Sequence, residues 1–247
     1  MHSNDDFQCL RYTHSGHLFI TPQDDCHAIV DAMLITGYNE DFCVAEDCSP
    51  EFASRLMEAG FLVMSANLAE DDEEPDYILL PKLHLIRSAL FYENLHIKKS
   101  IRRLLSRYEL RPDVDFDRII DRCIEKHGAA WLTPPLVECI KKIRSARSAA
   151  DCLAPTVNAR PASFALYRDG KLAAGEFGVV CGRVYTSYSG FYDEGNAGTV
   201  QIILTARYLE KQGFSFFDLG MPMDYKTELG AVDINPWEFV ELFRNSS

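Results

Sequence analysis

The chain has 247 residues, of which 47% are hydrophobic and 25% are charged, and its formal net charge is −12. This composition excludes wholesale disorder, and no apolar run reaches the roughly 18 residues that a membrane span needs. The first residues lack the basic and apolar segments of a secretory signal, so we expect a cytoplasmic protein. The eight cysteines and seven histidines are scattered without ligand spacing, so we expect reduced, interior thiols and neither a metal site nor a cofactor.

Residues 1–90 are expected to form a small N-terminal domain of mixed structure that is strongly acidic, with 4 basic and 17 acidic side chains. Short strands are predicted at 17–21 and 42–45. A helix is predicted from Pro50 to Gly60, because Ser49 can cap it, proline suits the first turn and glycine suits the end. The acidic run over 70–76 predicts an exposed loop.

Residues 91–150 carry the opposite charge, with 13 basic and 8 acidic side chains, and open a second domain expected to span 91–247. Apolar residues at helical spacing predict a helix over 97–108, and further helices are predicted over 116–128 and 133–148. The polar face of the first helix is either a solvated surface or a phosphate-binding stripe for one polyanionic partner. Its basic residues are Lys98, Lys99, Arg102, Arg103 and Arg107.

The last part of the chain predicts a meander of strands followed by a helix, a strand and a helix. Turn signals at Asp169-Gly170 and Gly182-Arg183 separate strands over 163–168, 171–181 and 184–188. A helix over 200–208, an apolar strand over 214–219 and a helix over 236–243 complete the pattern. This order predicts an α+β fold with a mostly antiparallel sheet, similar to the domain of N-acetyltransferases.

The predicted helix near residue 200 opens with Asn196-Ala-Gly-Thr. N-acetyltransferases cradle a pyrophosphate on a spaced glycine-rich loop at this place, and that loop is missing here. An acyl-CoA donor is therefore disfavoured, although a small-molecule acyltransferase that uses a CoA thioester stays open as an alternative.

Seven short segments carry a family resemblance. They are Leu95–Ser100, Trp131–Glu138, the hairpin Phe164–Glu176, Tyr188–Phe191, Asn196–Ala197, Phe216–Gly220 and Glu228–Ala231. In the same order they resemble the L-H-I-x-x-S, W-I-T-x-x-V-V-E-A, V-G-G, G-E-S-M-F, N-A-S-K, L-I-D-C-Q and S-L-G-A motifs of leucyl/phenylalanyl-tRNA–protein transferases. The resemblance runs in register from about residue 50 to 245.

The resemblance implies transfer of leucine or phenylalanine from a charged tRNA onto the α-amine of a protein that begins with Lys or Arg, which marks the product for N-end-rule degradation. The donor ester is already activated, so the enzyme mainly has to bring a neutral amine to the carbonyl. Near pH 7 only roughly a tenth of α-amines with a pKa of about 8 are deprotonated. The implied partners are aminoacyl-tRNA and a protein or peptide with a basic N-terminal residue, with no membrane involved.

A positioned carboxylate can attract the cationic terminus and accept or relay its proton. Asp218, which projects from an otherwise apolar strand, matches the acid of L-I-D-C-Q and is the candidate catalytic residue. Its expected contribution is to orient the amine, unless burial raises its basicity. Ser189 and the amide of Gly220 are candidates for stabilising the oxyanion. Without the resemblance, Asp218 is equally an acid that caps the turn after the strand.

The resemblance also implies where the substrates bind. Three aromatic residues would line a pocket for an apolar acyl side chain or stack on the terminal adenine, unless they simply fill the core. The other residues would contact the acyl-adenosine or add negative charge for a basic acceptor terminus, and the basic helix would clamp the acceptor stem. The implied substrate-binding residues are Trp131, Tyr188, Phe191, Tyr192, Asn196 and Asp224.

The chain departs from the family pattern at several pocket positions. Tyr188 stands where the family has the Glu of G-E-S, and Gly220 stands where it has the Gln of D-C-Q. The segment 62–65 takes the place of the aromatic F-P-W-F, and Met57 replaces a Tyr one helix turn earlier. These exchanges keep a second hypothesis open, namely a family member that binds tRNA or peptide without transfer.

Overall fold

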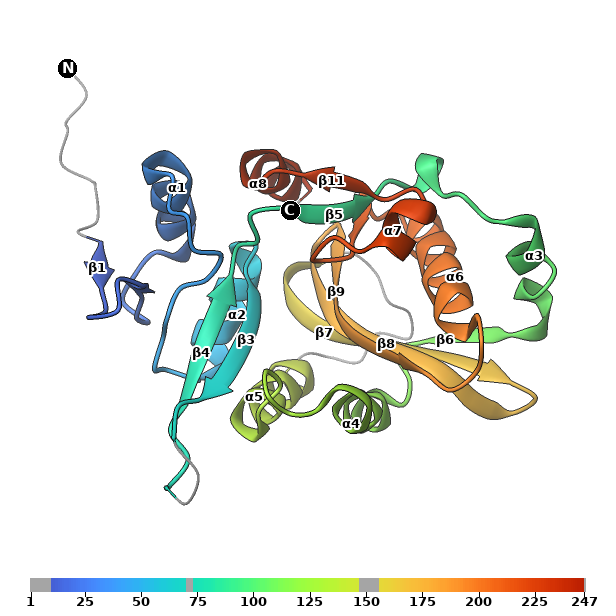
Figure 1. Cartoon of the computed structure of the whole chain (residues 1–247), viewed down its shortest axis with the longest axis horizontal. Helices are drawn as coiled ribbons and strands as arrows, with labels where there is room; N and C mark the ends of the chain where they lie inside the picture. Colours follow the sequence, from blue (N-terminus) through green and yellow to red (C-terminus); the bar gives the residue numbers. More distant parts are fainter. Residues whose placement is uncertain (1–9, 70–72, 147–155, 247) are drawn as a thin grey trace.

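The computed structural model describes residues 10–69, 73–146 and 156–246, and its largest feature is a curved seven-stranded sheet (Figure 1). The strand order is β11-β5-β10-β9-β8-β7-β6, and every neighbouring pair is antiparallel except β9 and β10, which are parallel. The predicted α+β class is confirmed. The strands are β5 (Arg87–Leu90), β6 (Glu109–Pro112), β7 (Thr156–Arg168), β8 (Lys171–Gly182), β9 (Val184–Tyr192), β10 (Phe216–Asp218) and β11 (Val232–Ile234).

The N-terminal part lies beside this sheet as helices and two small antiparallel strand pairs (Figure 1). The predicted strand at 17–21 is reduced to β2, and 42–45 forms isolated bridges to residues 19, 79 and 82 rather than a strand. The helix that begins at Pro50 is confirmed. The elements are β1 (Arg11–Tyr12), β2 (Leu18–Phe19), α1 (Cys26–Thr36), α2 (Pro50–Glu58), β3 (Leu62–Asn67) and β4 (Tyr77–Lys82).

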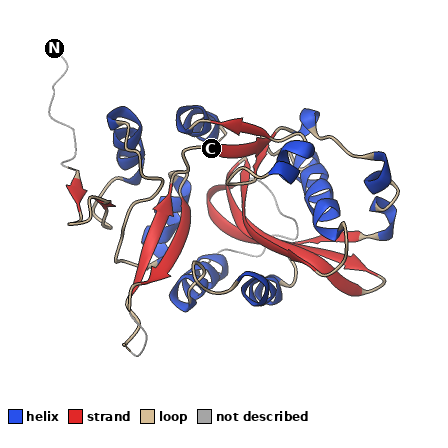
Figure 2. Cartoon of the chain, in the orientation of Figure 1, coloured by secondary structure: helices blue, strands red, loops and turns tan. Residues whose placement is uncertain are grey.

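Helices cover both faces of the seven-stranded sheet (Figure 2). α2, α4 and α5 pack on the face of β7 and β8 that carries the largest hydrophobic cluster, and α6 packs on the opposite face. The predicted helices over 116–128, 133–148, 200–208 and 236–243 are present with shifted ends. The elements are α4 (Phe116–His127), α5 (Pro134–Ser145), α6 (Ala197–Lys211), α7 (Asp224–Glu228) and α8 (Pro236–Asn245).

The predicted continuous helix over 97–108 is wrong. The segment forms only α3 (Lys99–Arg102) and the short 3₁₀ turn η2 (Leu105–Arg107), after another 3₁₀ turn, η1 (Tyr92–Asn94). Basic side chains recur four residues apart at 98/102, 99/103 and 103/107, and like charges at this spacing destabilise a helix. Packing of Ile101 and Leu105 into the cluster against α6 then decides the path of the chain.

One hydrophobic core joins the N-terminal part to the sheet. Its largest cluster runs from Leu18 through Phe52 of α2 and Phe177 of β8 to Phe243 of α8. The expected domain boundary at residue 90 coincides with the end of β5, and β5 lies inside the sheet between β11 and β10. The acidic residues 73–76 are exposed in the turn between β3 and β4, whereas 70–72 lie outside the described residues.

A bulge in β9 changes which side chains face α6. The register of β8 and β9 shifts between the pairs 177/189 and 178/187, so that Tyr188 is the extra residue. Gly178 permits this bulge, because a Cβ at that position would lie 2.1 Å from the Thr186 carbonyl oxygen. As a result, Ser187 faces the same side of the sheet as Glu176, as its hydroxyl bond to the Glu176 carboxylate shows.

Five of the cysteines, at 26, 43, 123, 139 and 181, are buried as expected, and Cys48 is half-buried. The cysteines at 9 and 152 lie outside the described residues. Within the described ranges, no helix has both the length and the apolar character of a membrane span. The same part of the chain holds no group of three or more His, Cys, Asp or Glu side chains arranged to bind a metal ion.

Candidate functional site

The short strand β10 runs parallel to β9 and ends beside the first half of it, and several predicted residues lie near this point. Asp218 is the last residue of β10 and lies opposite Thr186 of β9. Gly220 follows in the next turn, where a Cβ would lie 3.9 Å from the Ser187 carbonyl oxygen. The turn after β10 therefore lies beside β9 near Ser187, and α7 follows it in the chain (Figure 1).

Asp218 is fully buried, and donors occupy both of its carboxylate oxygens. Arg87 of β5 donates from Nη2 to Oδ2 at 2.7 Å and from Nε to both oxygens at 3.1 and 3.0 Å. The Thr186 hydroxyl donates to Oδ2 at 2.8 Å, and the Gly220 N–H donates to Oδ1 at 2.9 Å. The sequence-based expectation was a carboxylate that meets an acceptor amine, and in this structure Asp218 is not open to one.

Arg87 is the element that sequence reasoning missed. It is 1% exposed, its Nη1 donates to the Gly60 carbonyl at 3.1 Å, and its guanidinium lies 4.0 Å from the centre of the Phe239 ring. The ion pair therefore joins β5, β10, the end of α2 and α8. Asp218 therefore holds the turn after β10 in place and does not reach the surface.

The two oxyanion candidates are not brought together. The Gly220 N–H donates to Asp218, and its carbonyl accepts from the Ser88 N–H at 2.7 Å, so both backbone groups are engaged. Ser189 faces α4, where its hydroxyl bonds the thiol of Cys123. An oxyanion role for either residue would need a rearrangement of these bonds.

Only one of the three predicted pocket aromatics offers an exposed ring. The Tyr188 hydroxyl accepts from the Val63 N–H at 3.1 Å, and Phe191 is buried under the guanidinium of Arg122. Tyr192 is 53% exposed at the end of β9. The bulge thus turns Tyr188 toward the N-terminal part and leaves Tyr192 to face the solvent.

The remaining predicted substrate residues lie apart from one another. Trp131 is half-buried against the largest cluster, and its carbonyl accepts from both the N–H and the hydroxyl of Ser65 on β3. Asn196 is exposed with a φ of +67° just before α6, and Asp224 is exposed as the first residue of α7. Their contacts with substrates stay predictions.

The basic side chains of segment 98–107 are exposed, and residues just before this segment contact the family-like motif Glu228–Ala231. A Cβ at Gly230, which has a φ of +96°, would lie 1.9 Å from the Asn94 carbonyl oxygen, and the His96 N–H donates to the Leu229 carbonyl at 2.9 Å. Lys98 pairs with Glu228 at 2.6 Å, while within the described ranges the other four basic residues make no ion pair. Those four are Lys99, Arg102, Arg103 and Arg107.

Two buried titratable side chains near the turn after β10 were not singled out from the sequence. Glu176 of β8 is 4% exposed, and burial raises its pKa to about 7. Lys226 of α7 is 6% exposed, burial lowers its pKa to about 8, and its ammonium donates to the carbonyls of Leu219 and Met221 at 2.6 Å. The sequence signal for Glu176 was a charged residue inside the predicted strand 171–181, whose residues around it are apolar or glycine.

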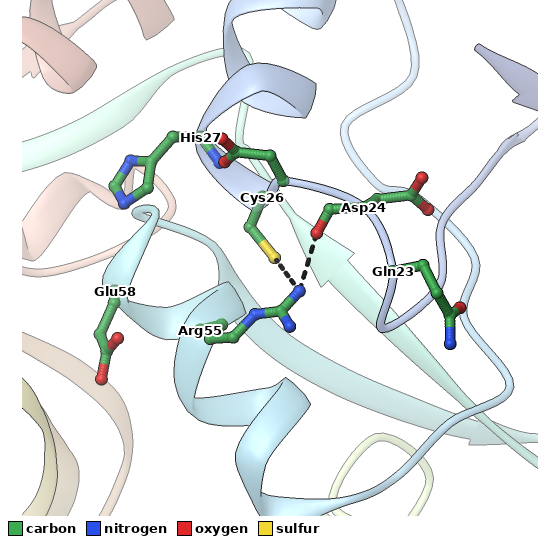
Figure 3. Close-up of a pocket in the computed structure, with 7 residues that line it drawn as sticks. Gln23, Asp24, Cys26, His27, Arg55 and Glu58 are labelled. Atoms are coloured by element: carbon green, nitrogen blue, oxygen red, sulfur yellow. Dashed lines mark hydrogen bonds between the residues drawn. The ribbon is translucent and has the colours of Figure 1, made fainter. Parts of the chain in front are cut away.

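A separate cavity of about 380 Å³ lies between α1 and α2 (Figure 3). Arg55 donates to the carbonyls of Pro22 and Asp24 and to the Cys26 sulfur, so it fastens the loop before α1. None of the predicted site residues lines this cavity. Its lining residues are Gln23, Asp24, Asp25, Cys26, His27, Arg55 and Glu58.

The sequence profile of the family described as leucyl/phenylalanyl-tRNA protein transferase matches residues 89–244. The chain belongs to this family. The matched span begins in β5 and ends in α8, so it contains the whole seven-stranded sheet except the first two residues of β5.

Curated relatives of the same name support this membership. The chain is 28% identical over 160 residues to the leucyl/phenylalanyl-tRNA–protein transferase of Pseudomonas putida (strain W619). This alignment covers 63% of this chain and 66% of the relative. It is 27% identical over 161 residues to that of Nitrosomonas eutropha, which covers 63% and 64%. The match thus spans slightly less than two thirds of these relatives.

Two solved structures align loosely with this one. A GCN5-related N-acetyltransferase from Kribbella flavida has a TM-score of 0.36 and 12% identity, with 87% of this chain and 73% of that chain covered. The C-terminal domain of a putative lysylphosphatidylglycerol synthetase from Agrobacterium fabrum has a TM-score of 0.38 and 13% identity, with 86% and 70% covered. The description of the fold rests on the sheet order given above.

Proposed function

We propose that the protein transfers an amino acid from an aminoacyl-tRNA to the N-terminal α-amine of a protein, in the manner of the family to which it belongs. The observation that carries this proposal is the family match over residues 89–244, which contain all of the sheet except the first two residues of β5. The product would carry a new N-terminal residue and would be a substrate for N-end-rule degradation in the cytoplasm.

The surface for the tRNA would be the basic segment 98–107. Its five basic side chains are exposed, in a chain whose net charge is otherwise strongly negative. Phosphates would be repelled from most of the molecule and attracted here, which would orient the acceptor stem toward the ends of β9 and β10.

Catalysis would depend on positioning rather than on a carboxylate that takes the proton. The donor ester is activated, so holding a neutral amine against the carbonyl supplies most of what the reaction needs. The Arg87–Asp218 pair would act as a positioning element, since it fixes the turn that contains Gly220. Trp131, Asn196 and Asp224 keep their predicted substrate contacts within this proposal.

The decisive experiment is a transfer assay. The protein is incubated with tRNAs charged with each amino acid and with a peptide that begins with Arg, and peptide mass is measured. A gain of one amino-acid residue is expected, and it should disappear when the tRNA is first deacylated. Absence of any mass gain across all charged tRNAs would refute the proposal.

A second candidate is a family member that binds tRNA or peptide without transfer. The buried Asp218 and the exchange of the family's Glu for the half-buried Tyr188 favour it. It predicts saturable, salt-sensitive binding of tRNA in the absence of any mass gain.

A further inference from the structure

A buried carboxylate with an unused oxygen lies between the sheet and α6. Glu176 Oε2 accepts from the Ser187 hydroxyl at 3.0 Å, but among the described residues Oε1 has no hydrogen-bond partner. The Gln201 amide on α6 donates to the Phe164 carbonyl and to the Thr205 hydroxyl, and its Oε1 is likewise unpartnered. The side chains of Ser187, Thr205 and Gln201 and the ammonium of Lys226 all favour the charged form of Glu176, yet its Oε1 still lacks a donor at hydrogen-bonding geometry among the described residues. Because buried acceptors are usually satisfied, the carboxylate can accept one further donor.

An exposed glycine lies beside Glu176 on the neighbouring strand β9. Glu176 pairs with Gly190 across β8 and β9, and directly opposed residues face the same side of a sheet. A Cβ at Gly190 would lie 3.2 Å from the Glu176 Cβ, and Gly190 itself is exposed. The resembling family motif G-E-S-M-F has a methionine at this position. With glycine at this position, no side chain of residue 190 covers Glu176.

Two half-exposed aromatic residues flank the same place. Tyr192 lies two residues beyond Gly190 on the same face, with its ring 3.0 Å from the Cβ position of Gly198 in the first turn of α6. Tyr225 of α7 is 43% exposed, and the charges of Glu176 and Tyr192 raise its pKa beyond the effect of burial. Lysine ammonium groups already lie near both rings, Lys126 at 5.5 Å from the centre of the Tyr192 ring and Lys226 at 5.8 Å from that of Tyr225. Aromatic rings near a carboxylate are an arrangement that suits organic cations.

We propose that Glu176, with Gln201 beneath and Tyr192 and Tyr225 at the rim, binds the cationic side chain of a substrate residue, an ammonium or a guanidinium. The inference rests on the proposed function, since the residue would belong either to the aminoacyl group of the tRNA or to the N-terminus of the acceptor. In the first case the protein transfers a basic amino acid, and in the second case Glu176 sets the preference for a basic acceptor.

Binding of small amides tests this proposal independently of transfer. The full chain is titrated calorimetrically with L-argininamide and with L-citrullinamide, which has the same shape and the same α-ammonium but an uncharged side chain. We expect argininamide to bind about tenfold or more tightly than citrullinamide, because only its side chain can pair with the buried carboxylate. Equal affinity for the two amides, or binding of neither, would overturn the proposal.

Two variants locate the effect. Glu176→Gln keeps the shape and should abolish the preference for argininamide, and Gly190→Met should also abolish it by covering the carboxylate from outside. Glu210→Gln, an exposed carboxylate on α6, is the matched control and should leave the preference unchanged. A preference that persists in Glu176→Gln would assign it elsewhere and contradict the proposal, and melting curves establish that each variant is folded.

The transfer assay then identifies the source of the cation. If the wild type adds Lys or Arg from tRNA and Glu176→Gln does not, the cation belongs to the transferred residue. If the wild type requires a peptide that begins with Arg rather than citrulline, and Glu176→Gln loses this requirement, it belongs to the acceptor. Preferential binding of argininamide without any transfer would refute the proposed function and leave the cation site intact.

Discussion

Replacing Asp218 by asparagine removes one charge of the buried pair and leaves the shape of the side chain nearly unchanged. Arg87 would then remain as a cation that is 1% exposed, with only the Gly60 carbonyl and the Phe239 ring as its other contacts. Breaking one partner of a buried ion pair costs about 3–5 kcal/mol. For a chain of this length such a loss lowers the melting temperature by about 6–20 °C.

Thermal and urea unfolding of the wild type and Asp218→Asn measure this loss directly. Asp233→Asn on β11 is the matched control, because Asp233 is exposed, and it should shift the transition by less than about 0.5 kcal/mol. The double variant Arg87→Met/Asp218→Asn should recover part of the loss, since it leaves no unpaired charge. A melting temperature of Asp218→Asn equal to that of the wild type would refute the assignment of Asp218 as a buried positioning residue.

The same variant separates positioning from proton transfer. At a temperature where Asp218→Asn is folded, a positioning role predicts that its transfer rate stays within about tenfold of the wild type. A carboxylate that takes the proton in the reaction would instead contribute about 10²–10⁴-fold. A loss of transfer rate of about 10²–10⁴-fold in a folded variant would support the sequence-based hypothesis of a catalytic Asp218.

Three further predictions concern the rest of the site. The unperturbed pKa of Glu176 is 4.5, and in the folded state burial raises it to about 7, so the folded state resists ionisation between these pH values. The wild type should therefore lose about 3 kcal/mol of stability relative to Glu176→Gln as the pH rises from 4.5 to 7. Urea midpoints that run parallel for both proteins over this range would contradict the burial of this carboxyl. Gly230→Ala should destabilise the protein by more than Gly213→Ala in melting experiments, since both glycines have positive φ but only the first faces a carbonyl oxygen at 1.9 Å; similar losses would show that the contact with Asn94 is unimportant. Alanine replacements in the basic segment should weaken tRNA binding and flatten the slope of log K against log salt by about 0.7–0.9 per lost phosphate contact. Lys211→Ala at the end of α6 is the control. An unchanged slope would show that this segment is a solvated surface. The replaced residues are Lys99, Arg102, Arg103 and Arg107.

Local signals located most elements of the fold correctly. The helix that begins at Pro50 and the hairpin around Asp169-Gly170 follow from proline in the first helical turn and from turn residues, which can be recognised from neighbouring residues. The predicted cap was wrong, since the Ser49 side chain makes no cap hydrogen bond. The basic segment was mispredicted because apolar periodicity outweighed the repulsion between charges four residues apart. The bulge at Tyr188 was also missed, because it depends on the contact of Gly178 with the neighbouring strand.

The sequence by itself determined the family, the α+β class and the positions of the motifs, because these follow from residue order and spacing. Only the tertiary structure decided which partners the charged residues of those motifs meet. Asp218 and Glu176 are both acids in apolar strands, and nothing in their local sequence separates them. Arg87, which is 131 residues away in the chain, donates hydrogen bonds to the Asp218 carboxylate. Glu176 Oε1, in contrast, meets no donor within the described part of the chain. Burial and long-range pairing set the role of an ionisable group, and both exist only once the chain has folded.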